Sequence, residues 1–380
     1  MADRSNSQVL YSPALRMKMG ELCGLRELEE GIADHVLPRL IVPPLAERND
    51  QQIEMFLSGK VPDIGAAISP YWRGRQVFID GTYLLQEDGK LTLDDWYPSM
   101  FARARYTGVA AIPMSMLQNI TEGNAAAYKN SINKKAVLKF GICVLSGDLV
   151  AADVATRIKL ALELLGLSAQ ECCVIADFSD SDFSDANVVR PIIRRSLEFL
   201  HEIAPWKHII FQGTHYPEKN PAQPGTHAVC ERNEWIAWKA AVGFDAQTAN
   251  YLIFGDYAAD CAKMEFGGSG GRPITHYRYA AESSWHVERG GSGKDEDQMR
   301  AVCKKLIAQR CFAGEDFSRA DRYIHNTAIG LDGPGNAATW RQVNTTHHIT
   351  RVVVDVGSVK GIRFSRLAPQ NRNDQMTFLT

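Results

Sequence analysis

"AVLKFGICVL" (136–145), "ECCVIAD" (171–177) and "WKHIIFQG" (206–213) are three short apolar runs, each of a length typical of a buried strand. Between them lie two segments, at 151–167 and 186–204, whose apolar residues recur on one helical face. The first of these segments reaches Gly166, a residue type that commonly ends helices. Strand, helix, strand, helix and strand in close succession predict a parallel sheet with right-handed crossovers.

The same alternation continues in both directions and predicts eight strands. Eight such units match a (β/α)8 TIM-like barrel, in which ligands bind at the carboxyl ends of the strands. An open, doubly wound sheet is the alternative. The expected strands are residues 9–15, 36–42, 75–80, 109–114, 136–145, 171–177, 207–213 and 250–255. Helices are also expected at about 20–33, 49–58, 94–106, 122–132 and 233–242.

The pattern changes beyond residue 260. Two glycine-rich stretches, at 266–273 and 289–297, flank a segment that has the pattern of a hairpin, and neither continues as a phosphate-binding P-loop. A helix over 297–311 is expected to be the eighth of the barrel. We therefore expect one (β/α)8 domain over 1–380, an inserted glycine-rich hairpin at 260–295 after strand 8, and a C-terminal helical extension at 330–380.

Composition excludes several classes of protein. The 380 residues carry a formal net charge of −2, so no global basic field favours nucleic acid or an acidic membrane. Apolar runs stay below the roughly 18 residues of a membrane-spanning helix, and the N-terminus lacks a signal-peptide pattern. The eight cysteines include no CxxC pair and are expected to be reduced core residues. We expect a cytoplasmic protein.

Acidic side chains stand at the ends of three expected strands. Asp80, Asp177 and Asp256 end or follow strands three, six and eight. A barrel brings these positions to one mouth, and ionised carboxylates brought close together repel unless a divalent cation or basic groups separate them. We therefore expect these three residues to hold Mg²⁺ or Mn²⁺. The alternative is that each aspartate serves as a helix cap or turn residue.

Loops at the same predicted mouth carry basic and aromatic residues. Arginine presents a planar fork suited to phosphate, and aromatic faces can stack on a base or a sugar. We expect a phosphate-containing ligand, with a set of ion pairs that hold long loops as the alternative. His215, after strand seven, is either a general acid or base or a surface histidine. The expected ligand-binding residues are Lys18, Glu21, Arg232, Tyr257, Arg278, Tyr279, Trp285 and Arg289.

Several short motifs, taken in order, resemble the beta protein family of bacterial and phage proteins. They include YSPALRMKMGE (11–21), VFIDGTYL (77–84), VIADFSD (174–180), ERNEW (231–235), FGDYAA (254–259) and HYRYAAESSWHVERGG (276–291), within residues 9 to 290. The resemblance implies a TIM-barrel-like fold and an association with mobile elements or anti-phage defence, but no established reaction. Relatives often have an arginine in strand five, where this chain has KFGICVL (139–145). The landmarks carried over are Tyr11, Lys18, Glu21, Asp80, Asp177, Arg232, Glu234, Trp235, Gly255, Asp256, Tyr257, Arg278, Tyr279, Trp285, Arg289 and Gly290.

The predicted site favours a protein that binds a nucleotide or a nucleic-acid end, and the resemblance implies that it acts in an anti-phage defence or mobile-element system. If it is an enzyme, we expect metal-dependent phosphodiester or nucleotide hydrolysis, with Glu234 or Glu21 as the base. One alternative is a non-catalytic sensor or scaffold that recognises a phage protein or a co-encoded effector. Another is a phage-borne protein that interferes with host machinery. The expected catalytic residues are Asp80, Asp177, Glu234 and Asp256, and the charge-neutralising residues are Lys18, Arg232 and Arg278.

Overall fold

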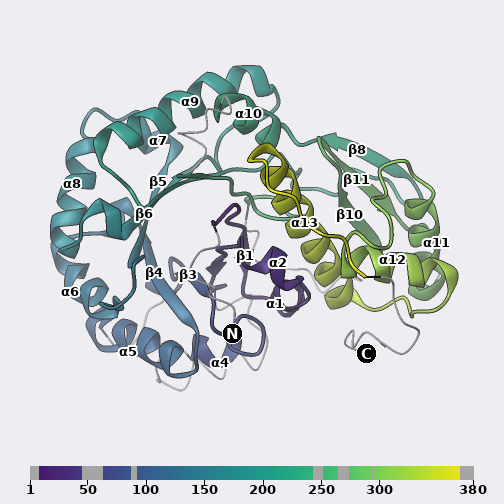
Figure 1. Ribbon diagram of the computed structural model, residues 1–380, viewed down its shortest axis with the longest axis horizontal. Coiled ribbons are helices and arrows are strands. Elements are labelled where there is room, and N and C mark those ends of the chain that lie inside the picture. The colour runs from purple at the N-terminus through teal and green to yellow at the C-terminus, as the bar shows by residue number, and fades with distance from the viewer. Residues whose placement is uncertain are drawn as a thin grey trace.

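The computed structural model describes residues 8–44, 63–86, 92–242, 251–263, 274–292 and 294–368. Its main body is a curled parallel sheet of eight strands with helices along its outer side (Figure 1). The helix expected at 49–58 lies outside the described residues. In pairing order the strands are β1 (Ala14–Arg16), β2 (Arg39–Ile41), β3 (Gln76–Asp80), β4 (Ala110–Met116), β5 (Phe140–Leu145), β6 (Cys172–Asp177), β7 (His208–Gln212) and β9 (Leu252–Ile253).

The strands are apolar on both faces because both faces of a parallel sheet are covered. β6 is buried over its whole length. Its residues Cys173 and Ile175 belong to one apolar cluster, whereas Cys172 and Val174 belong to the larger cluster that includes residues of the helices. All eight cysteines are free thiols, but only five lie in the core as expected, since Cys230, Cys261 and Cys311 are partly exposed.

Helices follow the strands along the chain and cover the outside of the sheet. α8 (Val154–Leu165) ends with Gly166 as its C-cap, whose φ of 64° lies in the left-handed region that glycine adopts readily, as predicted. The helices of this region are α1 (Met19–Arg26), α2 (Glu30–Ala33), α4 (Ile64–Ile68), α5 (Leu93–Tyr106), α6 (Glu122–Ser131), α7 (Ser146–Leu149), α8 (Val154–Leu165), α9 (Ala186–Ile203) and α10 (Asn233–Val242). Short 3₁₀ turns are η3 (Leu84–Gln86), η4 (Leu117–Asn119) and η5 (Ala169–Glu171).

The segment before β1 lies beside the segment after β9. Tyr11 forms an isolated parallel bridge with Phe254, and the Ser12 N–H donates to the Phe254 carbonyl at 2.9 Å. Gly255 permits this approach, because a Cβ there would lie 2.7 Å from the Ser12 carbonyl oxygen and 2.6 Å from that of Phe211. Both distances are too short for a real side chain, so this position requires glycine.

A smaller lobe follows β9 (Figure 1). The predicted hairpin is confirmed: β10 (His276–Ala280) pairs antiparallel with β11 (Ser284–Arg289). β8 (His227–Glu231), which comes from the main body of the chain, joins them as the outer strand on the other side of β11. α11 (Asp295–Ile307) and α12 (Arg319–Ile329) complete the lobe. α13 (Ala337–Val359) lies between the lobe and the curled sheet.

The assignment of residues 297–311 as the eighth barrel helix is wrong. These residues form most of α11, which packs mainly on α12 and the lobe sheet. The helix that packs along α1 is α13, in the segment predicted as an extension. Gly24 permits this contact, since a Cβ there would lie 2.7 Å from Cβ of Thr345. The hairpin, α11 and α12 therefore separate β9 from α13 along the chain.

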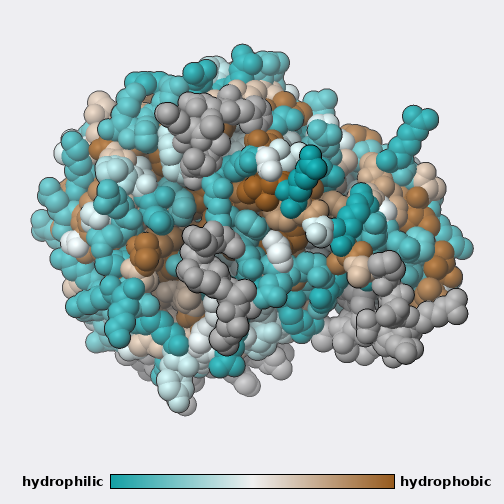
Figure 2. Space-filling view, in the orientation of Figure 1, coloured by the Kyte–Doolittle hydropathy of each residue, from teal (hydrophilic) through white to brown (hydrophobic). Residues whose placement is uncertain are grey.

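The surface has the polarity expected of helices that cover a sheet. α9 buries Val189, Ile193 and Leu197 and exposes Arg194 and Arg195. The face in Figure 2 is largely hydrophilic, with apolar residues in small groups between polar ones. Within the described ranges, no helix combines the length and the apolar character needed to cross a lipid bilayer.

Candidate functional site

Arg39 joins two of the predicted carboxylates at the carboxyl ends of the strands. Asp80 ends β3, Asp177 ends β6, and Arg39 begins β2. Arg39 Nε and Nη2 donate to Asp80 Oδ2 at 2.9 and 2.7 Å, and Nη1 donates to Asp177 Oδ2 at 2.8 Å. All three side chains are buried. The curvature of the sheet thus brings the two aspartates together, as predicted, but around a guanidinium group.

The remaining oxygens of these aspartates are also hydrogen-bonded. The Thr82 N–H and hydroxyl donate to Asp80 Oδ1 at 3.0 and 2.6 Å, and the Ser179 N–H donates to Asp177 Oδ1 at 3.0 Å. Burial by itself raises the pKa of Asp80, but Arg39 and Thr82 outweigh burial and lower it. Across the described ranges, no three His, Cys, Asp or Glu side chains are arranged to hold a metal ion. The expected three-aspartate metal site has no counterpart there.

Asp256, the third predicted carboxylate, lies in a neighbouring buried cluster. It accepts hydrogen bonds from the Tyr11 hydroxyl and, at 2.7 Å, from the Ala258 N–H. Its Oδ2 lies 2.8 Å from Nε2 of His348 on α13. Burial lowers the pKa of His348 although Asp256 opposes this, so a neutral imidazole donates from Nε2. Tyr257 connects the two clusters, because its hydroxyl lies 3.3 Å from Asp177 Oδ1.

Arg232 lies in the interior between the curled sheet and the lobe. Its Nη1 donates to the Ala281 carbonyl at 2.8 Å and to Asp355 Oδ2, on α13, at 3.2 Å. The guanidinium carbon lies 5.7 and 5.8 Å from the ring centres of Trp235 and Trp285. Arg232 is fully buried. It therefore ties the lobe to α13 and has no surface for a ligand from solvent.

Glu234, the predicted base, is fully buried as well. Its Oε2 accepts the His215 N–H at 3.1 Å, whereas Oε1 lies 3.9 Å from Arg232 Nε and finds no hydrogen-bond partner in the described ranges. Burial raises the pKa of Glu234 to about 7, against the opposing effect of Arg232. A carboxyl group in this position can bind a proton near neutral pH, but it does not line either cavity described below.

Two aromatic residues that were expected to bind a ligand contact histidines of the protein instead. The ring of Tyr279 stacks on His347 with centres 3.8 Å apart, and Trp285 stacks on His348 at 4.6 Å. Both aromatic side chains are buried, so these faces are occupied within the protein. Two further predicted residues that do not line the cavity described next are Lys18 and Arg289.

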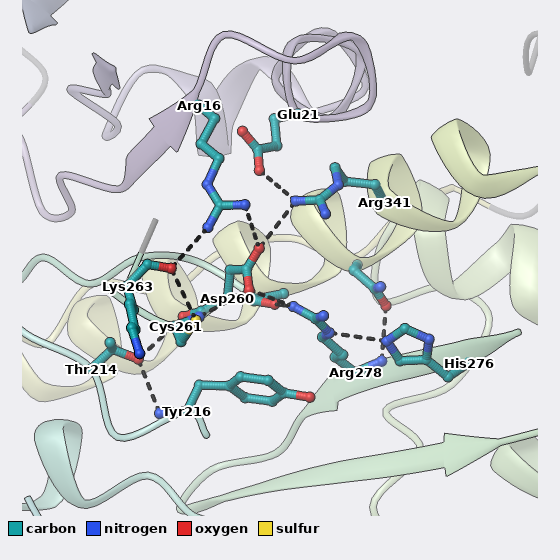
Figure 3. A network of polar contacts seen from close by, with 12 residues as sticks. Arg16, Glu21, Thr214, Tyr216, Asp260, Cys261, Lys263, His276, Arg278 and Arg341 are labelled. Carbon is teal, nitrogen blue, oxygen red and sulfur yellow. Dashed lines mark hydrogen bonds and ion pairs between the residues drawn. The ribbon is translucent and has the colours of Figure 1, made fainter. Parts of the chain in front are cut away.

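A cavity of about 290 Å³ opens between α1, the loop after β9, β10 and α13. Three arginines converge there on the carboxylate of Asp260 (Figure 3). Arg278 Nη1 lies 2.8 Å from Oδ1, and the Nη1 atoms of Arg341 and Arg16 lie 3.1 and 3.5 Å from Oδ2. Arg341 also donates to Glu21 Oε1 at 2.8 Å. Arg16 and Arg341 are more than 300 residues apart, so only the complete fold assembles this group.

The electrostatics of this cavity favour an anion. Three guanidinium groups face two carboxylates, which leaves one net positive charge when both acids are ionised. Burial raises the pKa of Asp260, but Arg278, Arg341 and Arg16 outweigh burial and lower it strongly, so it is ionised. Burial raises the pKa of Glu21, against the effect of Arg341, and its Oε2 has no hydrogen-bond partner among the residues that the structure describes.

His276 supports the arginine group from β10. Arg278 Nε donates to His276 Nε2 at 3.1 Å, and Nδ1 lies 2.8 Å from the Ile274 carbonyl oxygen. Burial, together with the Arg278 charge, lowers the pKa of His276 to about 4. The imidazole is therefore neutral at neutral pH, accepts from Arg278 and fixes the plane of its guanidinium group. A fixed fork is the geometry that recognises phosphate or carboxylate through two parallel hydrogen bonds.

The walls of the cavity mix apolar and polar groups. Trp340 and Ile274 supply apolar surface, and Tyr257 connects the cavity with Asp177. Glu21 adds a buried acceptor without a partner. The cavity therefore suits a small ligand with an anionic group for the arginines and a hydroxyl or amino group for Glu21.

A second cavity, of about 570 Å³, lies at the carboxyl ends of β6 and β7. His215 lines it, together with Tyr216 and Asp182. Burial lowers the pKa of His215, which keeps its imidazole neutral. The ring of Tyr216 lies 4.9 Å from the Arg278 guanidinium carbon, so these two side chains connect the walls of the two cavities. His215 is thus near the arginine group but does not line its cavity.

Sequence comparison identifies one family. A sequence model described as Beta protein matches residues 11–354. The match includes the curled sheet, the lobe and most of α13, and so contains all the residues that line the arginine cavity. No curated protein and no solved structure gave a significant match.

Proposed function

The chain belongs to the Beta protein family, and from the chemistry of its arginine cavity we propose that it binds a phosphate-containing ligand, a nucleotide or a nucleic-acid end. The observation that carries this proposal is the convergence of Arg16, Arg278 and Arg341 on one carboxylate at the wall of a cavity. Arginine clusters recognise phosphate through charge-assisted paired hydrogen bonds. The apolar wall beside them offers Trp340 to the rest of the ligand.

We also propose that the curled sheet closes into a (β/α)8 barrel. Support comes from the Tyr11–Phe254 bridge and the Ser12 hydrogen bond, which join the two ends of the sheet. In such a barrel the arginine cavity would lie at the carboxyl-terminal mouth, where barrel proteins bind their ligands. The position of α13 along α1 agrees with a ring of helices outside the barrel.

Replacing Arg278 with alanine is expected to weaken binding of adenosine 5′-monophosphate (AMP) by at least about tenfold, because charged hydrogen bonds contribute roughly 1.5–3 kcal/mol each. Arg278→Lys should restore only part of the affinity, since lysine keeps the charge and lacks the planar fork. Titration calorimetry measures both effects, and thermal unfolding with and without AMP checks that each variant folds.

The matched control for this test is Arg289→Ala. Arg289 belongs to the same hairpin, but its Nη1 donates to the Ala222 carbonyl at 2.9 Å and it does not line the cavity. The Arg289→Ala protein should bind AMP as the wild-type protein does. Equal losses in the two variants, or AMP affinity unchanged in Arg278→Ala, would contradict the assignment of the cavity as the ligand site.

We propose Glu21 as the general base of a hydrolytic step at this cavity. Within the described part of the chain its Oε2 has no hydrogen-bond partner, and its raised pKa makes it a better base than an exposed carboxylate. Glu21→Gln should retain AMP binding, because the three arginines remain, and should lose most of any phosphate release from adenosine triphosphate, by about 10²-fold or more. Phosphate release is measured directly. If Glu21→Gln releases phosphate as fast as the wild-type protein, another residue is the base. If the wild-type protein releases no phosphate, the cavity is a binding site without hydrolytic activity.

We place this binding activity in an anti-phage defence or mobile-element system, as the family resemblance suggests. Loss of protection against phage plating in Arg278→Ala, with protection retained in Arg289→Ala, is the corresponding cellular result. The alternative function, a sensor or scaffold, finds support in β8, an edge strand of the lobe with Val229 54% exposed. An unpaired strand edge can add a strand from a partner protein. Protection that is independent of the arginines but lost on substitution of Val229 favours this alternative.

A further inference from the structure

Asp260 occupies the place where the three arginines would hold an anion. Its two carboxylate oxygens accept from Arg278 and Arg341 and lie near Arg16, as the oxygens of a phosphate group would (Figure 3). We propose that Asp260 is an internal stand-in for the ligand, and that a phosphate monoester binds by displacing this carboxylate from the arginines. This inference rests on the proposed function of the cavity and adds its ligand class and its regulation.

The charge of the site selects a dianion. With Asp260 in place, the three guanidinium groups and the two carboxylates sum to one positive charge. When Asp260 leaves and Glu21 stays, the remaining charge is two positive. A phosphate monoester, at about −2 above its second pKa of about 6, neutralises this charge, whereas a diester with one negative charge leaves an excess of one. The site therefore favours a terminal phosphate over an internal diester linkage.

The loop that carries Asp260 is held by the same arginines. Arg278 Nη1 donates to the Ala259 carbonyl at 2.6 Å, and Arg16 Nη2 donates to the Lys263 carbonyl at 3.5 Å. Ala258 has a φ of 52°, a left-handed conformation that is disfavoured for a residue with a Cβ and that persists only where neighbouring contacts hold it. A ligand that binds these arginines therefore removes the contacts that hold the loop.

Release of this loop would also change the second cavity. Cys261 and Lys263 of the loop line that cavity, and the Thr214 hydroxyl donates to the Asp260 carbonyl at 3.3 Å. Asp260 lines the first cavity, and Cys261, the next residue, lines the second. Occupation of the arginine cavity by a monoester is thereby coupled to the shape of the cavity that contains His215.

The test compares AMP with 3′,5′-cyclic AMP by calorimetry at about pH 8, where the monoester is a dianion and the cyclic diester a monoanion. Wild-type protein should prefer AMP. Asp260→Asn should bind AMP about tenfold more tightly than wild type, because the competing carboxylate is gone. Without ligand it should melt at a lower temperature, and AMP should restore the melting temperature. Asp316→Asn, which removes the partner of Arg366 in an exposed ion pair, is the control and should leave AMP affinity unchanged.

Hydrogen exchange on the wild-type protein gives a second readout that needs no variant. The Cys261 N–H donates to Asp260 Oδ1 at 3.0 Å, so displacement of Asp260 should speed exchange at this amide when AMP binds. A structural aspartate would instead give unchanged or slower exchange there. If AMP binds the wild-type protein and not Arg278→Ala, yet Asp260→Asn binds more weakly and Cys261 stays protected, the stand-in role is overturned and the proposed function survives. If neither protein binds either nucleotide, both are overturned.

Discussion

Replacing Arg39 with methionine is expected to lower the free energy of unfolding by about 3–5 kcal/mol, the range found when one partner of a buried ion pair is removed. Arg39 donates three hydrogen bonds to Asp80 and Asp177, and all three side chains are at most 6% exposed. Methionine has an apolar chain of similar length but leaves two carboxylates close together without a counter-ion. Urea unfolding at pH 7 measures the loss.

The pH dependence of this loss identifies its cause. In the wild-type protein the lowered pKa of Asp80 contributes stability that is present above the carboxyl pKa of the unfolded chain and is lost as pH falls through the folded value. In Arg39→Met the unpaired carboxylates can instead take up protons, so the deficit should shrink as pH falls toward about 4.

Arg194→Met is the control for Arg39→Met, since Arg194 forms an exposed ion pair with Glu198 and should change stability by less than about 0.5 kcal/mol. If the free energy of unfolding of Arg39→Met lies within about 1 kcal/mol of the wild-type value, or if the difference does not depend on pH, the contact of Arg39 with Asp80 and Asp177 does not stabilise the fold.

The sequence predicted the positions of Asp80 and Asp177 because strand ends can be read from local patterns. Each of these residues closes an apolar run, and parallel strands carry such residues to one edge. Arg39 was missed although a signal exists: it is a lone charged residue within the apolar run 36–42, where a buried guanidinium requires carboxylate partners. Its distance along the chain from Asp177 hid the pairing.

The arginine cavity could be predicted only in part. Glu21 and Arg278 were identified, whereas Arg16, Asp260 and Arg341 were not. Arg341 lies on α13, in the segment predicted as a C-terminal helical extension, and no local pattern places that helix against α1. The correct assignment depends on which helix packs beside α1, and this is decided by tertiary contacts such as the close approach at Gly24.

α13 connects the arginine cavity, the buried cluster around Asp256 and the buried Arg232. Along this one helix, Arg341 reaches the arginine cavity, His348 reaches Asp256, and Asp355 accepts from Arg232. The three contacts lie on the side of α13 that faces the main body and the hairpin. A substitution that shifts α13 therefore disturbs all of them at once.

Glu234→Gln is expected to become more stable relative to wild type by about 3 kcal/mol as pH rises from about 4.5 to 7.5. Burial raises the pKa of Glu234 from 4.5 to about 7, and each unit corresponds to about 1.4 kcal/mol. A carboxyl group whose pKa is raised on folding contributes its full share of the folding stability below the pKa that it has in the unfolded chain. That stability is lost as pH rises through the folded value. Glutamine stays uncharged and keeps an oxygen for the His215 N–H.

Urea unfolding of both proteins at several pH values measures this difference. Arg232 and Asp256, which influence the Glu234 carboxyl, are present in both proteins, so the comparison isolates the ionisable group at position 234. Glu198→Gln, at an exposed position 47% accessible, is the control and should differ from wild type by less than about 0.5 kcal/mol across the range. Stability curves for Glu234→Gln and wild type that run parallel from pH 4.5 to 7.5 would mean that folding does not raise the pKa of Glu234. The unpartnered Oε1 beside Arg232 would then be a stable buried carboxylate rather than a protonated acid.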